Sequence, residues 1–412
     1  MSNLPKGWES VELGSVCKIN GRIGFRGYTV NDLVERNQGG AITLSPSNII
    51  GNKLDLSKCT YISDFKYEES PEIKIFNGDI ILVKTASIGK TALVENLLEK
   101  ATLNPQLVVL KDIKINNVFL SYIISSLIIQ KQIKQTSGGG VLQTLSQKQI
   151  AKYIFPLPPL EEQKKIADIL STVDKKIAFV EENINATEEL KKGLMQKLLT
   201  EGIGHTEFKD SELGRIHESW EVVQFDKVCD IRDGTHDSPK YIESGIPFIT
   251  SKHLTDNGID FTETNYISKE NHIEFSKRSK VDNGDILFGM IGTIGKPIIV
   301  NTDFEFSIKN IALLKLSCNE LLSNIYVLNL LKSNIITKQF SKLSNGGVQS
   351  FIALGMIRKL KIPLPPLEEQ KQIAEILSTV DNKLENLKEK KQSFEELKKG
   401  LMQKLLTGEI RV

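Results

Sequence analysis

Two stretches of the chain carry a heptad pattern of apolar positions. Within residues 156–200, and again within 363–407, apolar side chains recur at alternating intervals of four and three residues, and most positions between them are charged or polar. This pattern is typical of helices that pack against each other as a coiled coil. The expected seam consists of Ile166, Leu170, Val173, Ile177 and Val180 in the first stretch and of Ile373, Leu377, Val380, Leu384 and Leu387 in the second.

Each stretch has a marked helix start. Both begin with Pro-Leu-Pro-Pro, which a helix interior excludes, and the acidic pair Glu161-Glu162 follows in the first copy. Negative charge is favourable at a helix N-terminus because the helix dipole is positive there. At 1.5 Å per residue, ~40 residues give a helix about 60 Å long. Such a helix could pack on its own domain, but pairing of the two helices is the simpler interpretation.

The two stretches are copies of each other. Residues 156–200 and 363–407 are identical at 32 of 45 positions, at a constant offset of 207 and without a gap. The segments before them are more weakly related, and the Trp8-Glu9 pair returns as Trp220-Glu221. The repeat predicts a globular domain at 1–155, a helix at 156–200, a second globular domain at 201–362, and a second helix with a C-terminal tail at 363–412.

The direction of the helix pair follows from the domain between the two helices. The domain at 201–362 begins where the first helix ends and finishes where the second helix starts. In a parallel pair those ends would lie about 60 Å apart, which is farther than a compact domain of ~160 residues spans. We therefore expect an antiparallel pair, with the two domains related by a pseudo-twofold axis.

Each globular domain has the pattern of a mixed α/β (α+β) fold. Short β-rich runs such as 79–83 and 285–288 are separated by glycine and asparagine turns, and a helical stretch follows near 119–133 and near 323–340. The expected fold class is therefore two tandem mixed α/β domains separated by an antiparallel coiled coil of two long helices.

Composition narrows the class of protein. The chain has 412 residues, 40% hydrophobic and 25% charged, as in folded globular proteins. Its apolar runs are too short to span a membrane and its first twenty residues lack the apolar core of a signal peptide, so we expect a cytoplasmic protein. The net charge of +2 neither requires nor excludes a polyanionic partner. Four widely spaced residues are expected to be buried thiols rather than zinc ligands or disulfides: Cys17, Cys59, Cys229 and Cys318.

The motifs that would indicate catalysis are incomplete. Gly89-Lys90-Thr91 resembles the end of a phosphate-binding loop, but the first glycine of that loop would fall at Lys84. Residues 104–107, Asn-Pro-Gln-Leu, lack the second proline and the aromatic residue of the motif that holds a flipped adenine in amino-methyltransferases. We therefore expect no catalytic residues, and no metal site either, because known ligand spacings are not matched by His236, His253 and His272 with Asp237.

The duplicated segments resemble a known family. The pattern PLPPLEEQKxIAxILSTVD, followed by ELKKGLMQKLLT and preceded in each copy by a divergent domain, is similar to the specificity subunits of type I restriction-modification enzymes. The resemblance covers essentially the whole chain, with 1–155 and 201–362 matching the two target recognition domains of that family. One departure is His217, which stands where the first copy has Pro5 and affects only a local turn.

The resemblance implies a function and a set of partners. It implies a protein without catalysis of its own that reads the two halves of a bipartite double-stranded DNA site. It also implies recruitment of methyltransferase (modification) subunits, expected to be two, and of restriction/translocase subunits. S-adenosylmethionine, ATP and Mg would be bound by those partners, with no cofactor in this chain. The alternative is a duplicated coiled-coil scaffold for protein interactions that does not bind DNA, but a scaffold gives little reason for nearly identical helices beside divergent domains.

Candidate DNA contacts lie in polar, basic loops near glycine-rich turns, where side chains and backbone can approach a groove. In the second domain the family resemblance at residues 233–236 and 251–253 guides the choice. The candidates are Arg22, Arg26, Tyr28, Lys84, Ser87, Lys90 and Gln143 in the first domain and Thr235, His236, Lys240, Ser251, Lys252, His253, Lys296 and Gln349 in the second.

Overall fold

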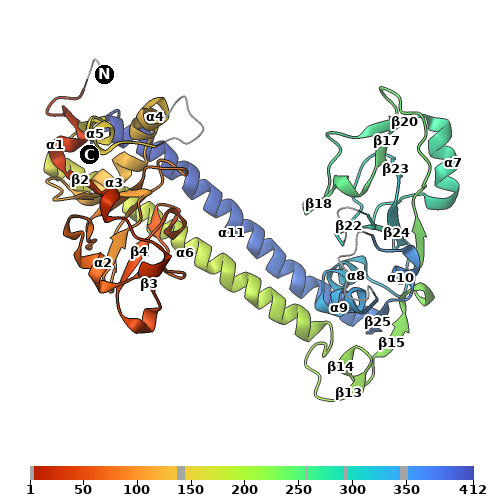
Figure 1. The fold of residues 1–412 in the computed structure, drawn as a ribbon. Helices are drawn as coiled ribbons and strands as arrows, with labels where there is room; N and C mark the ends of the chain where they lie inside the picture. Colours follow the sequence, from red (N-terminus) through yellow and green to blue (C-terminus); the bar gives the residue numbers. More distant parts are fainter. Residues whose placement is uncertain (1–3, 137–143, 257, 292–294, 344–350) are drawn as a thin grey trace. The chain divides into compact units, whose positions relative to one another are not determined.

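The chain folds into two compact units. The computed structural model describes residues 4–136, 144–256, 258–291, 295–343 and 351–412 (Figure 1). Unit 1 comprises Met1–Glu181 and Glu389–Val412, and unit 2 comprises Glu182–Lys388. Each long helix therefore contributes residues to both units, whereas the sequence-based division treated each helix as a separate segment. That four-part division stays a prediction. Among the described residues, no helix is long and apolar enough to cross a membrane.

The described residues of unit 1 form two sheets and two short strand pairs, β1-β12 and β5-β6. One sheet is antiparallel with the order β2-β11-β8-β9, and the other has the order β10-β4-β7-β3, in which β10 is parallel to β4. The antiparallel pair β1-β12 joins the start of the unit to the strand that leads into α6. The strands are β1 Glu9–Glu12, β2 Lys18–Gly21, β3 Leu33–Val34, β4 Ala41–Leu44, β5 Ile49–Ile50, β6 Lys53–Leu54, β7 Tyr61–Ile62, β8 Ile80–Val83, β9 Thr91–Leu93, β10 Ala101–Leu103, β11 Leu107–Lys111 and β12 Ile154–Leu157.

Strand β8 shows why the apolar runs in the sequence become central strands. Ile80 and Leu82 pack into a core shared with the helices of the unit, while Ile81 and Val83 pack into a second core with the other sheet. Side chains alternate between the two faces of a strand, so a continuous apolar run is required when both faces are covered. The short helices of the unit are α1 Leu13–Val16, α2 Asp64–Glu68, α3 Asn117–Ser125, α4 Leu127–Thr136 and α5 Gln147–Ala151.

Unit 2 repeats this plan. Its antiparallel sheet has the order β16-β24-β21-β22, and its second sheet has the order β20-β17-β23, with β17 parallel to β23 and antiparallel to β20. The pair β15-β25 corresponds to β1-β12 of unit 1, and the hairpin β13-β14 precedes it. The strands are β13 Phe208–Ser211, β14 Gly214–His217, β15 Glu221–Gln224, β16 Asp230–Asp233, β17 Ile246–Ile249, β18 Leu254–Thr255, β19 Gly258–Ile259, β20 Asn265–Ile267, β21 Ile286–Gly289, β22 Pro297–Ile299, β23 Ser307–Ile308, β24 Ile311–Lys315 and β25 Lys361–Leu364. The short helices are α7 Lys269–Ser279, α8 Asn324–Leu331, α9 Asn334–Leu343 and α10 Leu354–Arg358.

The repeat extends to individual hydrogen bonds. In unit 1, Gln132 on α4 donates to the Ile154 carbonyl at 2.7 Å and accepts from the Ile154 amide at 2.9 Å. In unit 2, Gln339 on α9 makes the same two bonds with Lys361, at 2.8 and 2.9 Å. Both members of each pair are related by the offset of 207 found in the sequence, so α4 corresponds to α9 residue by residue.

The long helices α6 (Leu160–Leu198) and α11 (Leu367–Thr407) pair in antiparallel fashion within each unit (Figure 1). In unit 1, Lys398 lies 2.7 Å from Asp174 and Lys391 lies 2.9 Å from Glu181, so residue numbers rise along one helix as they fall along the other. In unit 2 the same relation holds, because Lys191 lies 2.5 Å from Asp381 and Glu188 lies 3.7 Å from Lys388. The expected antiparallel direction is therefore confirmed within each unit, and so are the mixed α/β units in tandem.

The expected seam positions differ in how deeply they are buried. Ile177 and Leu387 are half-buried, and the remaining seam residues named from the sequence are buried. Lys391 occupies the next heptad position of α11 after Leu384 and Leu387, where an apolar residue would continue the seam, and its ammonium group pairs with Glu181. A charged residue is tolerated there because its stem can pack while its head stays in water.

In each unit a carboxylate near the start of a long helix holds a tryptophan; Glu162 in unit 1 is buried and Glu369 in unit 2 is half-buried. Glu162 accepts a hydrogen bond from the Trp8 indole at 3.0 Å and two from Arg411, at 2.6 and 2.8 Å. Arg411 also donates to the Lys6 carbonyl at 3.2 Å, so the segment after α11 lies against the first residues of unit 1. In unit 2 the corresponding Glu369 accepts from the Trp220 indole at 3.0 Å.

The cysteines only partly match the expectation from the sequence. Cys17 and Cys229 are buried and Cys59 is half-buried, but Cys318 is exposed, so the prediction of buried thiols is wrong for that residue. Cys318 lies in the turn after β24, where the chain leaves the core. Burial raises the pKa of Cys17 and of Cys229 to about 12, which keeps both thiols protonated and unreactive at neutral pH.

Candidate nucleic-acid interface

In unit 2, the chain leaves β16 through a tight backbone contact that positions the loop at 234–240. A Cβ atom on Gly234 would lie 2.3 Å from the Ile308 carbonyl oxygen, so only glycine fits at this position. The next residue, Thr235, is buried and its amide donates to the same carbonyl at 3.1 Å. The loop is therefore fixed to the segment between β23 and β24 before its exposed residues begin.

His236 is the first exposed side chain of this loop. Its ring is held from both sides, with Nε2 2.9 Å from an Asp233 carboxylate oxygen and Nδ1 2.6 Å from the Asn310 side-chain oxygen. The other Asp233 oxygen pairs with Arg278 of α7. The His236 side chain is 62% exposed whereas that of Asp233 is 8% exposed, so a buried carboxylate orients an accessible ring. Because both ring nitrogens are engaged, the exposed part of this oriented ring is suited to van der Waals contact with a base or sugar.

The other candidates of unit 2 divide into buried and exposed groups. Ser251 and His253 are buried: the Ser251 hydroxyl donates to the Asn310 carbonyl at 3.4 Å, and the His253 ring caps the turn at Thr250 through the Thr250 amide at 2.9 Å. Lys240 and Lys252 are exposed. Lys296 is half-buried and lies 3.2 Å from Asp256. The structure thus gathers Thr235, His236 and Ser251 around residues 308–310.

In unit 1, Arg22 is buried inside the domain. Its Nε donates to the Leu103 carbonyl at 2.9 Å, its second amino group donates to the Thr102 hydroxyl at 3.2 Å, and its guanidinium lies over the Tyr28 ring at 5.2 Å. Burial lowers the pKa of Arg22, but its ordinary value is so high that the group stays charged. Arg22 therefore holds Tyr28 and the turn after β10 in place. Arg26, which is half-buried, lies 3.3 Å from Glu72.

The loop after β8 presents exposed candidates on a constrained backbone. Ser87 and Lys90 are exposed and Lys84 is half-buried. Ala86 has a φ of 65°, a left-handed conformation that costs energy for a residue with a Cβ atom. Gly89 has a φ of 91°, and its carbonyl accepts from the Gln130 side chain at 2.9 Å. This loop is therefore held by its own turn geometry and by α4.

The role of each candidate as a DNA contact stays a prediction. Gln143 and Gln349 lie outside the described residues. Arg22, Thr235, Ser251 and His253 have internal hydrogen bonds and buried side chains, so they support the loops, whereas the exposed candidates are placed to reach a ligand. Among the described residues there is no group of three or more histidine, cysteine or acidic side chains arranged to hold a metal ion.

Three residues near His236 were missed by the sequence analysis. Asp233 contacts one ring nitrogen, Arg278 pairs with Asp233, and Asn310 contacts the other ring nitrogen. Asn310 has a φ of 54°, which asparagine tolerates better than most residues. The one signal in the sequence was the polar pair Lys309-Asn310 between two apolar strands, which is typical of a turn.

Comparison with known proteins agrees with this architecture. The family described as the type I restriction modification DNA specificity domain matches residues 5–189 and 217–396. The MjaX specificity subunit of a type I restriction enzyme from Methanocaldococcus jannaschii is 33% identical, over 100% of this chain and 96% of that protein, and the MjaVIII subunit of the same organism is 29% identical, over 99% and 94%. A solved chain from the type I R-M system covers 100% of both chains with a TM-score of 0.61 at 19% identity, which shows the same fold. The chain therefore belongs to the family of type I restriction-modification DNA specificity subunits.

Proposed function

We propose that this chain reads a bipartite double-stranded DNA site and catalyses no reaction itself. Each unit would read one half of the site through its exposed loops. The observation that carries the proposal is the contrast between the two units: sheet order and supporting hydrogen bonds repeat, while the residues of the candidate loops differ. A repeated fold that carries different loops is suited to two related domains that recognise different DNA sequences.

The same proposal assigns catalysis to partner subunits. Methyltransferase subunits, expected to be two, would use S-adenosylmethionine, and restriction/translocase subunits would use ATP and Mg. This chain would place them on the DNA. The competing function, a scaffold that joins proteins without binding DNA, predicts no dependence of any partner's activity on the exposed loop residues.

Binding to duplex DNA over a range of salt concentrations tests the proposal. The purified full chain, with its modification subunits, should bind duplex with an affinity that falls steeply as salt rises, because phosphate contacts release counterions. Lys252→Ala in the candidate loops should weaken binding, whereas Lys227→Ala, an equally exposed lysine of unit 2 outside those loops, should change it less than twofold. Salt-independent binding, or equal effects of the two variants, would favour the scaffold.

Substitution of His236 tests more directly whether unit 2 recognises a DNA sequence. Mapping the methylated sites made by the complex should show that His236→Ala alters the half-site read by unit 2 and leaves the other half-site unchanged. Incubation of the chain alone with duplex and labelled S-adenosylmethionine should transfer no label. Transfer without a modification subunit would overturn the assignment of catalysis to the partners.

A further inference from the structure

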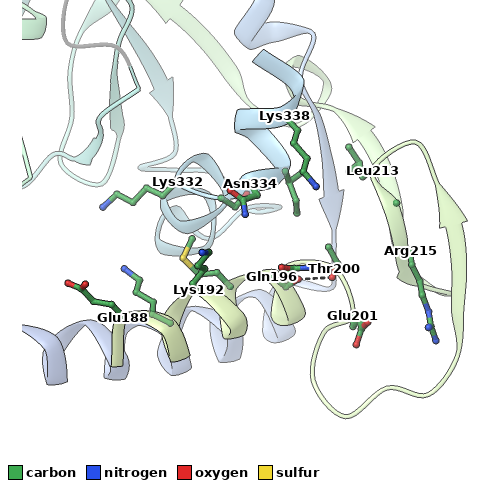
Figure 2. Close-up of a pocket in the computed structure, with 15 residues that line it drawn as sticks. Glu188, Lys192, Gln196, Thr200, Glu201, Leu213, Arg215, Lys332, Asn334 and Lys338 are labelled. Atoms are coloured by element: carbon green, nitrogen blue, oxygen red, sulfur yellow. Dashed lines mark hydrogen bonds between the residues drawn. The ribbon is translucent and has the colours of Figure 1, made fainter. Parts of the chain in front are cut away.

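A basic pocket lies in unit 2 where the end of α6 meets the turn between α8 and α9. Its volume is about 530 Å³. Figure 2 shows its walls: the last turns of α6 carry Glu188 and Lys192, the α8–α9 turn carries Lys332 and Asn334, and the hairpin β13-β14 closes a third side. Lys338 extends from α9 toward the α6 side (Figure 2).

Three exposed lysines of this pocket form no ion pair within the part of the chain that the structure describes, although Glu188 and Glu201 also line the pocket and Asp381 and Asp256 partly offset the charge of Lys332. Among those residues, Lys192, Lys332 and Lys338 make no ion pair or side-chain hydrogen bond, whereas Lys191 beside them is paired with Asp381 at 2.5 Å. Burial, and next the positive charge of Lys191, lower the pKa of Lys332. Positive charges that are only partly offset and repel one another are relieved by a bound anion.

The α9 N-terminus adds to this positive field. Ser333, Asn334 and Ile335 line the pocket, and α9 begins at Asn334. The amides of the first helical turn have no partner within the helix and point along the positive end of its dipole, an arrangement that favours phosphate. The pocket thus combines three lysine side chains with fixed amide donors.

We propose that this basic pocket binds the sugar-phosphate backbone of the duplex, outside the loops that read bases. The inference rests on the proposed DNA-binding function. The argument for this occupant is charge complementarity. A duplex backbone carries a closely spaced row of negative charges, and the pocket offers lysine side chains and the positive end of α9.

The pocket is a feature of unit 2. The α6 wall is repeated in sequence, and Lys192 corresponds to Lys399 by the offset of 207. The other wall is repeated only in part: Lys338 corresponds to Lys131, whereas Ser125 and Leu127 stand in unit 1 where unit 2 has Lys332 and Asn334. Unit 1 therefore lacks the third lysine, and the phosphate contact and its salt dependence would be stronger at the half-site read by unit 2.

Matched lysine substitutions test the pocket. The pocket variant is Lys192→Gln with Lys338→Gln, and its control is Lys399→Gln with Lys131→Gln, the corresponding exposed lysines of unit 1. Both variants remove the same charge from equivalent helices. Binding to a labelled duplex of arbitrary sequence, about 40 base pairs long, is measured between about 50 and 200 mM salt with the full chain and its modification subunits, after circular dichroism has shown that both variants are folded.

In the pocket variant the slope of log affinity against log salt should become shallower. Its magnitude should fall by about 0.9 for each phosphate that the protein no longer neutralises, so by up to about 1.8. It should weaken binding about tenfold at about 100 mM salt, equally for the recognised site and for arbitrary sequence, and adding Lys332→Gln should weaken it further. The control should change affinity less than twofold. Equal slopes in both variants would overturn the inference.

Two further outcomes are distinguishable. If the pocket variant loses its modification subunits while its DNA slope stays unchanged, the pocket is a protein-docking site and the inference is wrong. If the wild-type complex shows no salt-dependent binding to any duplex, the proposed function itself fails. If the wild-type complex binds duplex and the pocket variant binds it equally well, the pocket does not contact DNA. The proposed function is then unaffected.

Discussion

Glu162→Gln should loosen the first residues of unit 1. The Glu162 carboxylate is buried and accepts from the Trp8 indole, which is also buried, at 3.0 Å. A neutral amide cannot accept from Trp8 and from both Arg411 donors at once, so at least one donor is left without an acceptor. Removing a hydrogen bond to a buried charge costs about 1.5–3 kcal/mol. Arg411 is partly exposed and should add little, because water can solvate it.

Hydrogen exchange measured by mass spectrometry detects this local loosening in the peptides concerned. Peptides covering residues 4–16 and 405–412 should exchange faster in Glu162→Gln by about one to two orders of magnitude, the equivalent of ~1.5–3 kcal/mol in local opening. Peptides from unit 2 serve as the internal reference. The matched control is Glu161→Gln, whose side chain is 79% exposed and pairs with Lys164. Equal exchange in the two variants would refute the argument that the buried carboxylate holds the start of the unit.

The same cluster gives a pH dependence with a defined sign. Hydrogen bonds from Arg411, against the opposing effect of burial, lower the pKa of Glu162 below its ordinary value of 4.5. A carboxylate whose pKa is lower in the folded state stabilises the fold above the unfolded pKa. This contribution disappears as the pH falls through the lower folded value. Wild-type exchange at residues 4–16, corrected for intrinsic rates, should therefore begin to approach that of Glu162→Gln only as the pH falls below the ordinary value of 4.5.

Three further outcomes are expected. Gly234→Ala should disrupt the loop before His236 and lower thermal stability, because the new Cβ atom would meet the Ile308 carbonyl at 2.3 Å; an unchanged melting temperature would contradict this. Ala86→Gly should raise the melting temperature slightly, since it relieves a left-handed φ of 65° worth about 1 kcal/mol, and a decrease would show that the strain is compensated. Leu170→Ala, at a buried seam position, should destabilise by about 2–5 kcal/mol in urea unfolding, and Leu387→Ala, at a half-buried one, by clearly less.

The long-range plan of the fold was predictable because it depends on spacing and repetition. The heptad pattern located α6 and α11, and the length argument gave their antiparallel direction, which the Lys398–Asp174 pair confirms in unit 1. Strand order was not predictable. The β10-β4 pair is parallel and joins segments about sixty residues apart. The apolar pattern of each segment does not indicate which strands will be its neighbours in the sheet.

The candidate site was predictable only at the level of loops. Arg22 and His236 are both polar residues in glycine-rich segments, yet Arg22 is buried against the Leu103 carbonyl while the His236 ring is exposed. The difference arises from tertiary partners. Arg22 follows β2 and donates to Thr102 and Leu103 of β10, whereas His236 is held at its ring nitrogens by Asp233 and Asn310 and stays exposed. Residue type and local sequence carry no information about such partners.

The pairing of Glu162 with Arg411 shows how a repeat can keep a structural role while changing its residues. Both copies retain the acceptor and the tryptophan, and the two indole bonds have the same length of 3.0 Å. The remaining partners differ: the Ile203 amide donates to Glu369 at 3.1 Å, and His205, not an arginine, lies 2.6 Å from it. In each copy the carboxylate fixes which atom must be satisfied, and donors from the segment that follows the other long helix satisfy it. The requirement for one particular residue type therefore applies to Glu162 and Glu369 themselves. This explains why the helix starts are nearly identical while the segments that follow the helices diverge.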